Sequence, residues 1–224
     1  MKRSEINQKI SEAKEFFDEM KFILPPWGLW RLEEWQQNRE QCNEIIENGL
    51  GWDLTDFGSG DFAATGLLLF TLRNGNISKD HKTYAEKIMI VEEDQVTPMH
   101  FHWSKMEDII NRGGGNLMIQ LYPSNESEEF ADHEFKVSLD GIINTFQPGE
   151  VARLTPGESI TLNQGLYHKF YGETGMGKVL VGEVSAVNDD NTDNRFHTEV
   201  GRFPDIEEDE PPVHLLVGDY ATFI

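Results

Sequence analysis

The feature that most constrains the fold of this chain is a long succession of short β-type segments between residues 53 and 187. Stretches rich in glycine, asparagine and proline separate these segments, and such residues favour tight turns. No helical periodicity lies between them, so we expect an antiparallel sandwich or barrel rather than a helix-linked parallel sheet. The expected strands are Thr65–Arg73, Tyr84–Glu92, Val96–Trp103, Glu107–Arg112, Asn116–Pro123, Glu134–Leu139, Ile142–Phe146, Val151–Leu154, Ser159–Leu162, His168–Tyr171 and Lys178–Val187.

The first 50 residues differ, because their apolar residues recur at three- and four-residue steps. Ser4 stands where it can cap a first helix, and Pro25-Pro26 ends that helix because proline lacks the amide donor. A second apolar stripe begins at Leu32 and stops at Gly49. No flexible linker follows, so we expect both helices to cover the sheet and regard a separate helical domain as the weaker alternative.

Composition narrows the class of partner. The chain has 224 residues with 40 acidic and 19 basic side chains, which gives a formal charge of −21. Such a charge repels phosphate backbones and anionic lipid headgroups, so we expect neither nucleic acid nor a membrane as a partner. The apolar stretches are strand-sized, no apolar signal core is present, and Cys42 is the only cysteine. The expected compartment is the cytoplasm.

The residues with the clearest chemical content lie between positions 99 and 107. His100 and His102 are two apart, and residues two apart in a strand project from the same face. Glu107 follows a short turn, and a strand returning from that turn would bring its carboxylate beside the two imidazoles. Imidazole and carboxylate form a donor set of borderline hardness, which suits manganese, iron, cobalt, nickel or zinc.

A second segment, Gly157–His168, is rich in turn residues and supplies a third histidine, His168, at the start of another expected strand. A His-x-His pair on its own also describes a surface pair or a packed core histidine. The combination of this pair with His168 favours a metal site.

The first of these segments resembles the first of the two metal motifs of the cupins. That motif consists of a leading glycine, His-x-His, a glutamate and a closing glycine at fixed spacing. In this chain Asp94 stands at the leading position and Gly114 closes the pattern around His100, His102 and Glu107. The departure concerns a turn residue and leaves the expected ligands in place.

The second segment resembles the second cupin motif. Gly157 and Gly165 fit before His168, whereas Asn163 replaces a proline and Gly172 replaces an asparagine. The resemblance implies a mainly β fold, the cupin double-stranded β-helix or jelly-roll barrel, with an N-terminal helical extension. The implied layout is a single cupin domain over residues 1–224, with the extension at 1–50, the barrel at 53–200 and a C-terminal segment at 201–224.

The likeness extends to a narrower family. Val91–Asn116, Gly182–Arg195 and Gly201–Pro204 contain runs that resemble bacterial D-lyxose isomerases. The resemblance implies a metal-dependent aldose–ketose isomerase that interconverts D-lyxose with D-xylulose and D-mannose with D-fructose through a cis-enediolate. It also implies a monosaccharide substrate and Mn²⁺ as the cofactor, with Co²⁺, Fe²⁺, Ni²⁺ or Zn²⁺ as alternatives, held by His100, His102, Glu107 and His168.

Cupins of this size often pair through barrel faces or N-terminal segments. The resemblance therefore implies a homodimer, and the apolar stripe on the first helix is a candidate contact.

Moving a proton between C2 and C1 of a sugar requires an acid and a base as well as the metal. If the turn keeps register, Lys105 projects to the same side as His100, His102 and Glu107, so we expect it to reach the substrate side of the metal. Glu183 lies within an apolar strand, where an unpaired carboxylate is costly, so it is either salt-bridged structure or an acid/base group. Lys87 poses the same question, with a solvent-facing edge lysine as the alternative. We predict Lys105, Glu183 and Lys87 as the catalytic residues.

Two other functions are compatible with the same ligands. A cupin dioxygenase or decarboxylase would use them with iron or manganese, and an oxygenase, unlike an isomerase, would stop without dioxygen. A non-catalytic sugar-binding cupin is disfavoured, because such proteins often lose ligands and all four are present here. Asp189, Asp190 and Arg195 are candidates to bind substrate hydroxyls, with a solvated loop as the alternative.

Overall fold

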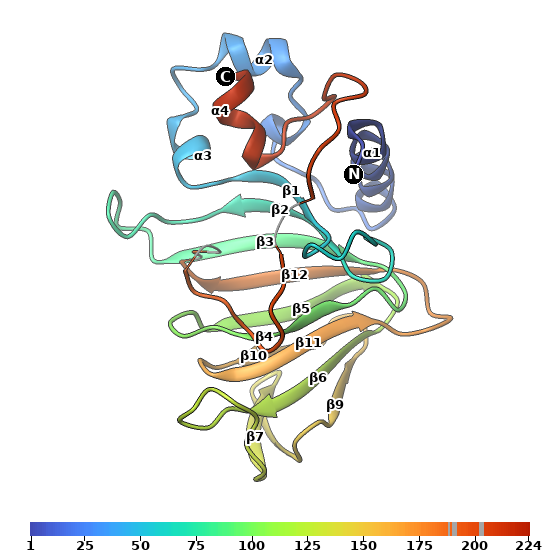
Figure 1. The fold of residues 1–224 in the computed structure, drawn as a ribbon, viewed down its shortest axis with the longest axis vertical. Coiled ribbons are helices and arrows are strands. Elements are labelled where there is room, and N and C mark those ends of the chain that lie inside the picture. The colour runs from blue at the N-terminus through green and yellow to red at the C-terminus, as the bar shows by residue number, and fades with distance from the viewer. Residues whose placement is uncertain (188, 190–191, 202–203) are drawn as a thin grey trace.

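A computed structural model of the chain describes residues 1–187, 189, 192–201 and 204–224. The β segments form two antiparallel sheets that build a barrel (Figure 1). The larger sheet has the order β1-β2-β3-β12-β5-β10-β7-β8 and the smaller one β13-β4-β11-β6-β9. Their strands are β1 (Gly51–Thr55), β2 (Leu67–Arg73), β3 (Tyr84–Val91), β4 (Thr97–Phe101), β5 (Glu107–Gly114), β6 (Leu117–Pro123), β7 (Phe135–Leu139), β8 (Ile142–Phe146), β9 (Val151–Leu154), β10 (Ser159–Leu162), β11 (Leu166–Gly172), β12 (Val179–Ala186) and β13 (Arg195–Phe196).

The mainly β jelly-roll architecture predicted from the sequence is confirmed. The expected strands correspond to β2 through β12, with ends displaced by a few residues. Two further strands, β1 and β13, were not predicted. β1 extends the larger sheet beside β2, and β13 pairs with β4 at the edge of the smaller sheet.

The N-terminal region contains α1 (Arg3–Glu19), the 3-10 turn η1 (Pro26–Leu29), α2 (Leu32–Gln37) and α3 (Asn43–Glu47). The expectation of one continuous second helix is therefore wrong. The side chain of Asn38 donates to the carbonyl of Glu34, and a short amide that bonds its own backbone competes with helix propagation.

Ser4 does not cap α1, because the helix begins earlier and Lys2 is its N-terminal flanking residue. The backbone N–H of Lys2 donates to the Glu5 carboxylate, and the Ser4 N–H donates to Asp209. The C-terminal segment thus satisfies a helix-terminal amide that the local sequence was expected to satisfy.

The helices and both chain ends gather at the β1 end of the molecule (Figure 1). α1 packs Ile6, Ile10 and Phe17 against the outer face of the larger sheet, where Leu68 and Phe70 of β2 meet them. Ile6 and Ile10 are fully buried, so the apolar stripe of α1 is consumed within the chain and is not a free contact for a second copy. No helix among the described residues is long and apolar enough to cross a bilayer.

The barrel interior is divided between apolar and polar side chains. Leu117, Ile119 and Leu121 of β6 belong to an apolar core that fills one part of the barrel. Buried polar side chains from β3, β4, β5, β11 and β12 occupy another part, and this polar region holds the residues singled out in the sequence. The C-terminal segment closes with η2 (Val217–Asp219) and α4 (Tyr220–Phe223).

Candidate metal centre

Strand pairing places the three histidines together. In the β4–β11 ladder His100 lies directly opposite His168. His102 follows the last residue of β4, and Glu107 is the first residue of β5, after the turn that crosses between the two sheets. All four side chains are buried.

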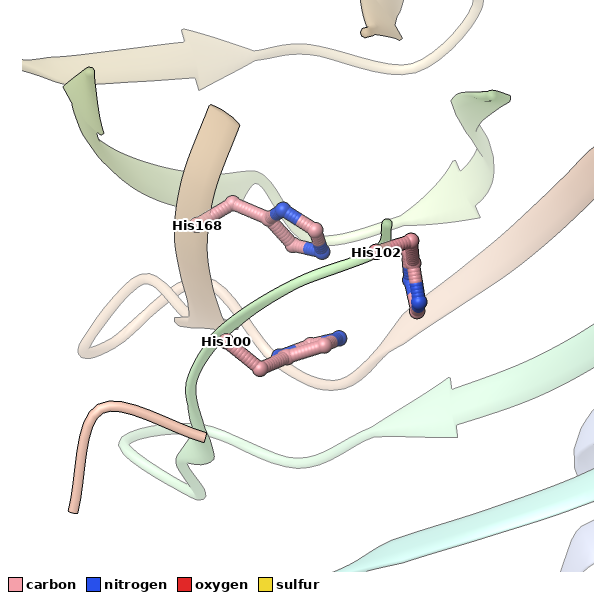
Figure 2. Close-up of side chains that lie close together, drawn as sticks. All are labelled: His100, His102 and His168. Carbon is pink, nitrogen blue, oxygen red and sulfur yellow. The ribbon is translucent and has the colours of Figure 1, made fainter. Parts of the chain in front are cut away.

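The three imidazoles turn toward a common point (Figure 2). One ring nitrogen from each of His100, His102 and His168 lies within 4.8 Å of the other two. Two donor atoms bound to one transition-metal ion, each at about 2.1 Å, lie at most about 4.2 Å apart. The spacing therefore suits a single ion after small side-chain adjustments.

Hydrogen bonds to the backbone fix which nitrogen faces that point. His100 Nδ1 lies 2.7 Å from the carbonyl oxygen of Pro98, and His168 Nδ1 lies 2.9 Å from that of Leu166. His102 Nδ1 lies 2.9 Å from the carbonyl oxygen of Asp193. A carbonyl only accepts, so each Nδ1 carries the proton and each Nε2 presents its lone pair, as in metal-binding histidines.

Glu107 places a carboxylate oxygen beside two of these nitrogens. Its Oε1 lies 3.4 Å from His102 Nε2 and 3.1 Å from His168 Nε2. Both Nε2 atoms are buried, and neither forms a hydrogen bond with the described residues. Buried polar atoms without a partner are costly, and a cation shared by these nitrogens and Oε1 would satisfy them. This donor set fits a divalent transition metal.

The electrostatics favour the protonation states that a metal requires. Burial holds the pKa of His100 well below its usual range, and the neighbouring His168 and His102 lower this pKa further. Burial alone would raise the pKa of Glu107, but the charge of Lys105 and the contacts with His102 outweigh it, so this pKa lies well below its usual range. A neutral imidazole and an ionised carboxylate are the ligand forms that bind metal.

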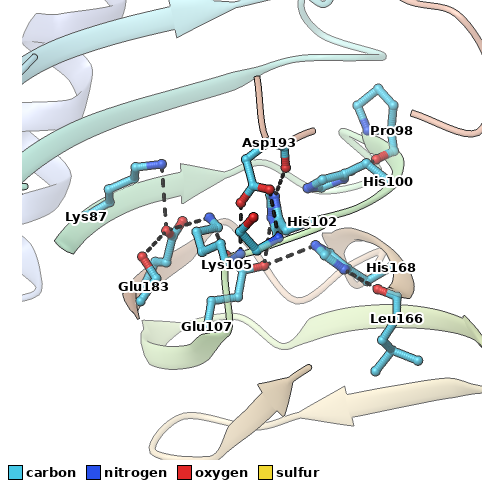
Figure 3. Close-up of polar contacts among 12 residues, drawn as sticks. Lys87, Pro98, His100, His102, Lys105, Glu107, Leu166, His168, Glu183 and Asp193 are labelled. Carbon is cyan, nitrogen blue, oxygen red and sulfur yellow. Dashed lines mark hydrogen bonds and ion pairs between the residues drawn. The ribbon is translucent and has the colours of Figure 1, made fainter. Parts of the chain in front are cut away.

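A chain of ionic contacts leads from Glu107 toward β3 (Figure 3). Lys105 Nζ lies 2.6 Å from Glu107 Oε2 and 2.9 Å from Glu183 Oε1. Lys87 Nζ lies 3.7 Å from the same Glu183 oxygen, and the Ser185 hydroxyl donates to it at 3.0 Å. Among the described residues none donates to Glu183 Oε2. Glu183 is thus salt-bridged, and Lys87 is buried inside the barrel rather than facing solvent.

These residues surround a cavity of about 100 Å³. A larger hollow of about 790 Å³ lies beside α1, β1 and the C-terminal segment, but none of the four candidate ligands lines it, so size does not identify the site. Lys87, Lys105 and Glu183 line the small cavity on one side, and His100, His102 and Glu107 line it on another. The remaining lining residues are Asp53, Thr55, Phe57, Leu67, Leu69, Met89, Thr97, Ile109, Phe170, Asn194 and Phe196.

Of the three loop residues predicted to bind substrate hydroxyls, the two that the structure describes do not line the small cavity. Arg195 pairs with the carboxylates of Glu128 and Glu129 and is not among the residues that line the small cavity. Asp189 lines the larger hollow, and its carboxylate accepts the Thr192 hydroxyl. Asp190 lies outside the described residues.

Sequence reasoning missed three residues at the site. Asp193 contacts His102 through its carbonyl and the following turn through its carboxylate. Phe196 stacks on His100 with ring centroids 5.3 Å apart. The hydroxyl of Thr97 is buried without a hydrogen-bond partner among the described residues. Strand alternation gave no signal for Thr97, because residues three apart in a regular strand project from opposite faces. A β-bulge between the Thr97–Phe170 and His100–His168 pairs brings Thr97 to the cavity, and Phe196 reaches His100 through the pairing of β13 with β4.

The departures from the cupin motifs leave the backbone conformation of the turns intact. Asp94, at the leading glycine position, adopts φ +57°, a left-handed conformation that glycine adopts freely and aspartate tolerates better than most residues. Gly157 and Gly165 also have positive φ angles.

Comparison with known proteins gives a consistent set of relatives. The family model described as D-lyxose isomerase matches residues 1–220. The chain is 51% identical over 227 residues to a D-lyxose/D-mannose isomerase of Serratia proteamaculans, and 49% identical over 226 residues to one of Escherichia coli O157:H7, with complete coverage of both partners in each case. Among solved structures, the L-ribose isomerase of Cellulomonas parahominis shares the fold with a TM-score of 0.63 at 15% identity, covering 92% of this chain and 98% of that one.

Proposed function

The chain belongs to the D-lyxose isomerase family of aldose–ketose isomerases, and we propose that it interconverts D-lyxose with D-xylulose and D-mannose with D-fructose in the small cavity beside His100. The curated relatives at about half identity carry the name D-lyxose/D-mannose isomerase, which supports both sugars as substrates. The substrate would be an unphosphorylated monosaccharide.

The proposed metal ligands are His100, His102, His168 and Glu107. The convergence of the three ring nitrogens and the orphaned Nε2 atoms support this assignment. Mn²⁺ is the proposed ion, with Co²⁺, Fe²⁺, Ni²⁺ and Zn²⁺ as alternatives that suit the same nitrogen and carboxylate donors. A divalent ion bound there would polarise the sugar carbonyl and stabilise the negative charge that develops on it.

Glu183 is the proposed base. Its Oε1 is held by Lys105 and Ser185, while Oε2 remains without a donor among the described residues. The carboxylate takes the proton from C2 of the aldose, and the C–H electron pair becomes the C1=C2 double bond of the cis-enediolate, with the charge on the former carbonyl oxygen. The Glu183 carboxyl exchanges its proton with solvent and delivers a proton to C1, and transfer of the O2 proton to O1 then leaves a carbonyl at C2.

Lys105 and Lys87 are the proposed supporting residues of this proton transfer. Lys105 contacts both Glu107 and Glu183, so its ammonium fixes the distance between the ligand carboxylate and the base. Lys87 lies opposite Glu183 in the β3–β12 ladder and balances its charge from the other side. A donor cluster of this kind is preorganised to hold developing negative charge.

The observation that carries the proposal is the unbroken series of contacts from Glu183 through Lys105 to Glu107. It joins a carboxylate that is able to move a proton to the cluster that is able to bind a cation, within one cavity.

Metal removal and refilling test the proposal. The protein is stripped with a chelator, reloaded with single metals, and incubated under argon with D-lyxose or D-mannose in heavy water while proton NMR is recorded. We expect ketose to form only after reloading, with deuterium at the carbon next to the carbonyl. Turnover that requires dioxygen, or ketose formed by stripped protein at the full rate, would contradict it.

We also propose that the enzyme is a homodimer, although not through the apolar stripe of α1. The edge strand β8 carries Ile142 and Ile143, which are 68% and 63% exposed, and an apolar edge of this kind supports pairing with a second chain. Light scattering is expected to give twice the chain mass of 25.6 kDa, and a value near 25.6 kDa would reject the dimer.

A further inference from the structure

The three histidines differ in where their backbone partners come from. His100 and His168 each bond the carbonyl of the residue two positions earlier, so their own strands orient them. His102 instead bonds the carbonyl of Asp193, which lies 91 residues away in the loop between β12 and β13. The orientation of His102 therefore depends on the position of that loop.

Asp193 is attached to the β4–β5 turn by its side chain as well. Its Oδ1 accepts the backbone N–H of Ser104 and its Oδ2 accepts that of Lys105, both at 2.8 Å (Figure 3). Hydrogen bonds from backbone amides to a carboxylate are among the stronger ones, and the two oxygens used together fix both distance and angle. The carboxylate thus sets where the carbonyl of its own residue meets His102.

The same two hydrogen bonds fix the backbone position from which the Lys105 side chain extends. Lys105 lies in the turn rather than in a strand, so no sheet ladder holds its backbone. Its ammonium nevertheless reaches Glu107 at 2.6 Å and Glu183 at 2.9 Å. Hydrogen bonds to the carbonyls of His102, Ser104 and Met106 also hold this turn. The Asp193 carboxylate accepts the amide of Lys105 itself, so its loss would remove the bond closest to the side chain that enters the cavity.

We propose that Asp193 is a positioning residue that holds His102 and Lys105 in register with each other, and so couples retention of the metal to proton transfer at Glu183. This inference rests on the proposed function for its catalytic part. Its metal-binding part requires only that His102 is a ligand. Removing an outer partner of a metal-binding histidine typically weakens metal affinity about 10- to 100-fold.

Three variants test the inference. Asp193→Ala removes both side-chain bonds but leaves the carbonyl, and Asp193→Asn keeps one acceptor oxygen. Asp209→Ala is the matched control, because the Asp209 carboxylate also bridges distant segments by accepting a backbone N–H, that of Ser4, and does not contact the cavity.

Three measurements are made on each variant: the Mn²⁺ dissociation constant by calorimetry, the tautomer of His102 in the metal-free protein by two-bond ¹H–¹⁵N NMR, and kcat and KM for D-lyxose at saturating Mn²⁺. For Asp193→Ala we expect Mn²⁺ binding weakened about 10- to 100-fold. We also expect loss of the pure Nδ1–H tautomer of His102, and a lower kcat with little change in KM.

Asp193→Asn should fall between Asp193→Ala and the wild type on all three measurements, and it decides the question if Asp193→Ala fails to fold. Asp209→Ala should match the wild type. Wild-type Mn²⁺ affinity and a wild-type tautomer in either Asp193 variant would overturn the inference.

The failure of the proposed function would look different. In that case the unmodified protein would bind Mn²⁺ without converting D-lyxose or D-mannose. The Asp193 variants would still be judged by their Mn²⁺ affinity and by the His102 tautomer.

Discussion

At the scale of single residues, two buried carboxylates have clearly different surroundings. Glu107 places one oxygen near His102 and His168 and the other against Lys105. Glu183 Oε1 accepts from Lys105 and from the Ser185 hydroxyl, and the carboxylate lies on the far side of Lys105 from the histidines (Figure 3). The surroundings of Glu107 suit a metal ligand, and those of Glu183 suit a proton carrier. Lys105 lies between the two carboxylates and contacts both.

This division of roles predicts the behaviour of Glu183→Gln. The amide keeps the shape of the side chain and cannot take up a proton, so kcat should fall by about 10²- to 10⁴-fold, the usual contribution of a general base. Mn²⁺ affinity should stay within about threefold of the wild type. The rate of deuterium incorporation from heavy water measures the loss of turnover, and calorimetric titration measures the Mn²⁺ affinity.

The control for this substitution is Glu86→Gln on the neighbouring strand β3. Glu86 faces outward and pairs with Arg73, so its loss should leave turnover unchanged. Near-full turnover of Glu183→Gln would remove Glu183 from the mechanism.

Single residues also show how far the sequence predicts the site. Strand parity placed His100 beside His102, and the spacing of the following turn brought Glu107 to them. Parity could not decide whether Glu183 was salt-bridged or active, because the answer depends on which strands flank β12. Asp193 could not be found at all, because its carbonyl has no residue-specific signature and its partner lies in a distant turn.

At the scale of elements, most strands could be predicted from the sequence, whereas the contacts between elements distant in the sequence could not. The alternating and apolar runs of β2 to β12 carry their own signal. β1 and β13 are short, and their place in the sheets depends on pairing with β2 and β4, which no local pattern reveals. For the same reason the start of α1 was misplaced at Ser4, whose amide bonds the C-terminal segment.

Arg3, in the first turn of α1, joins this helix to the C-terminal segment through a buried ion pair. This side chain is fully buried and pairs with Asp219 of η2 at 2.8 Å and with Glu208 at 2.7 Å. Removing one partner of a buried ion pair leaves the other charge uncompensated, and the loss is typically about 3–5 kcal/mol. Arg3→Leu should lower the free energy of unfolding in urea by about this amount.

Arg153→Leu is the matched control for Arg3→Leu. Arg153 makes an ion pair with Glu173, but its side chain is 46% exposed, and exposed pairs contribute about 1 kcal/mol or less. Equal losses in the two variants would contradict a special role for the buried pair.

At the scale of the whole molecule, the two chain ends are held together by acidic groups of the C-terminal segment. The stretch Asp205–Pro212, which the sequence marks only as a charge run, supplies Glu208 to Arg3 and Asp209 to Ser4. The hydrogen bond from Arg3 holds the pKa of Glu208 below its ordinary value of 4.5.

This lowered pKa predicts a pH dependence of stability. Below pH 4.5 the unfolded chain binds a proton at Glu208 before the folded chain does, so protons favour unfolding. The stabilisation from Glu208 is therefore complete above pH 4.5 and is lost as the pH falls through the lower folded pKa. Urea unfolding of metal-free wild type and Glu208→Gln, from pH 7 to pH 3, should show a stability difference that shrinks below pH 4.5. A difference that is constant or grows on acidification would contradict this assignment.

We propose that four side chains, from β4 and the residue that follows it, from β5 and from β11, hold one divalent ion inside the barrel. Diffraction from Mn²⁺-loaded crystals, measured at the manganese absorption edge, tests it directly. We expect one strong anomalous peak per chain, at bonding distance from Nε2 of His100, His102 and His168 and from Oε1 of Glu107. An anomalous map with no peak among these atoms, or with the ion bound elsewhere, would contradict it.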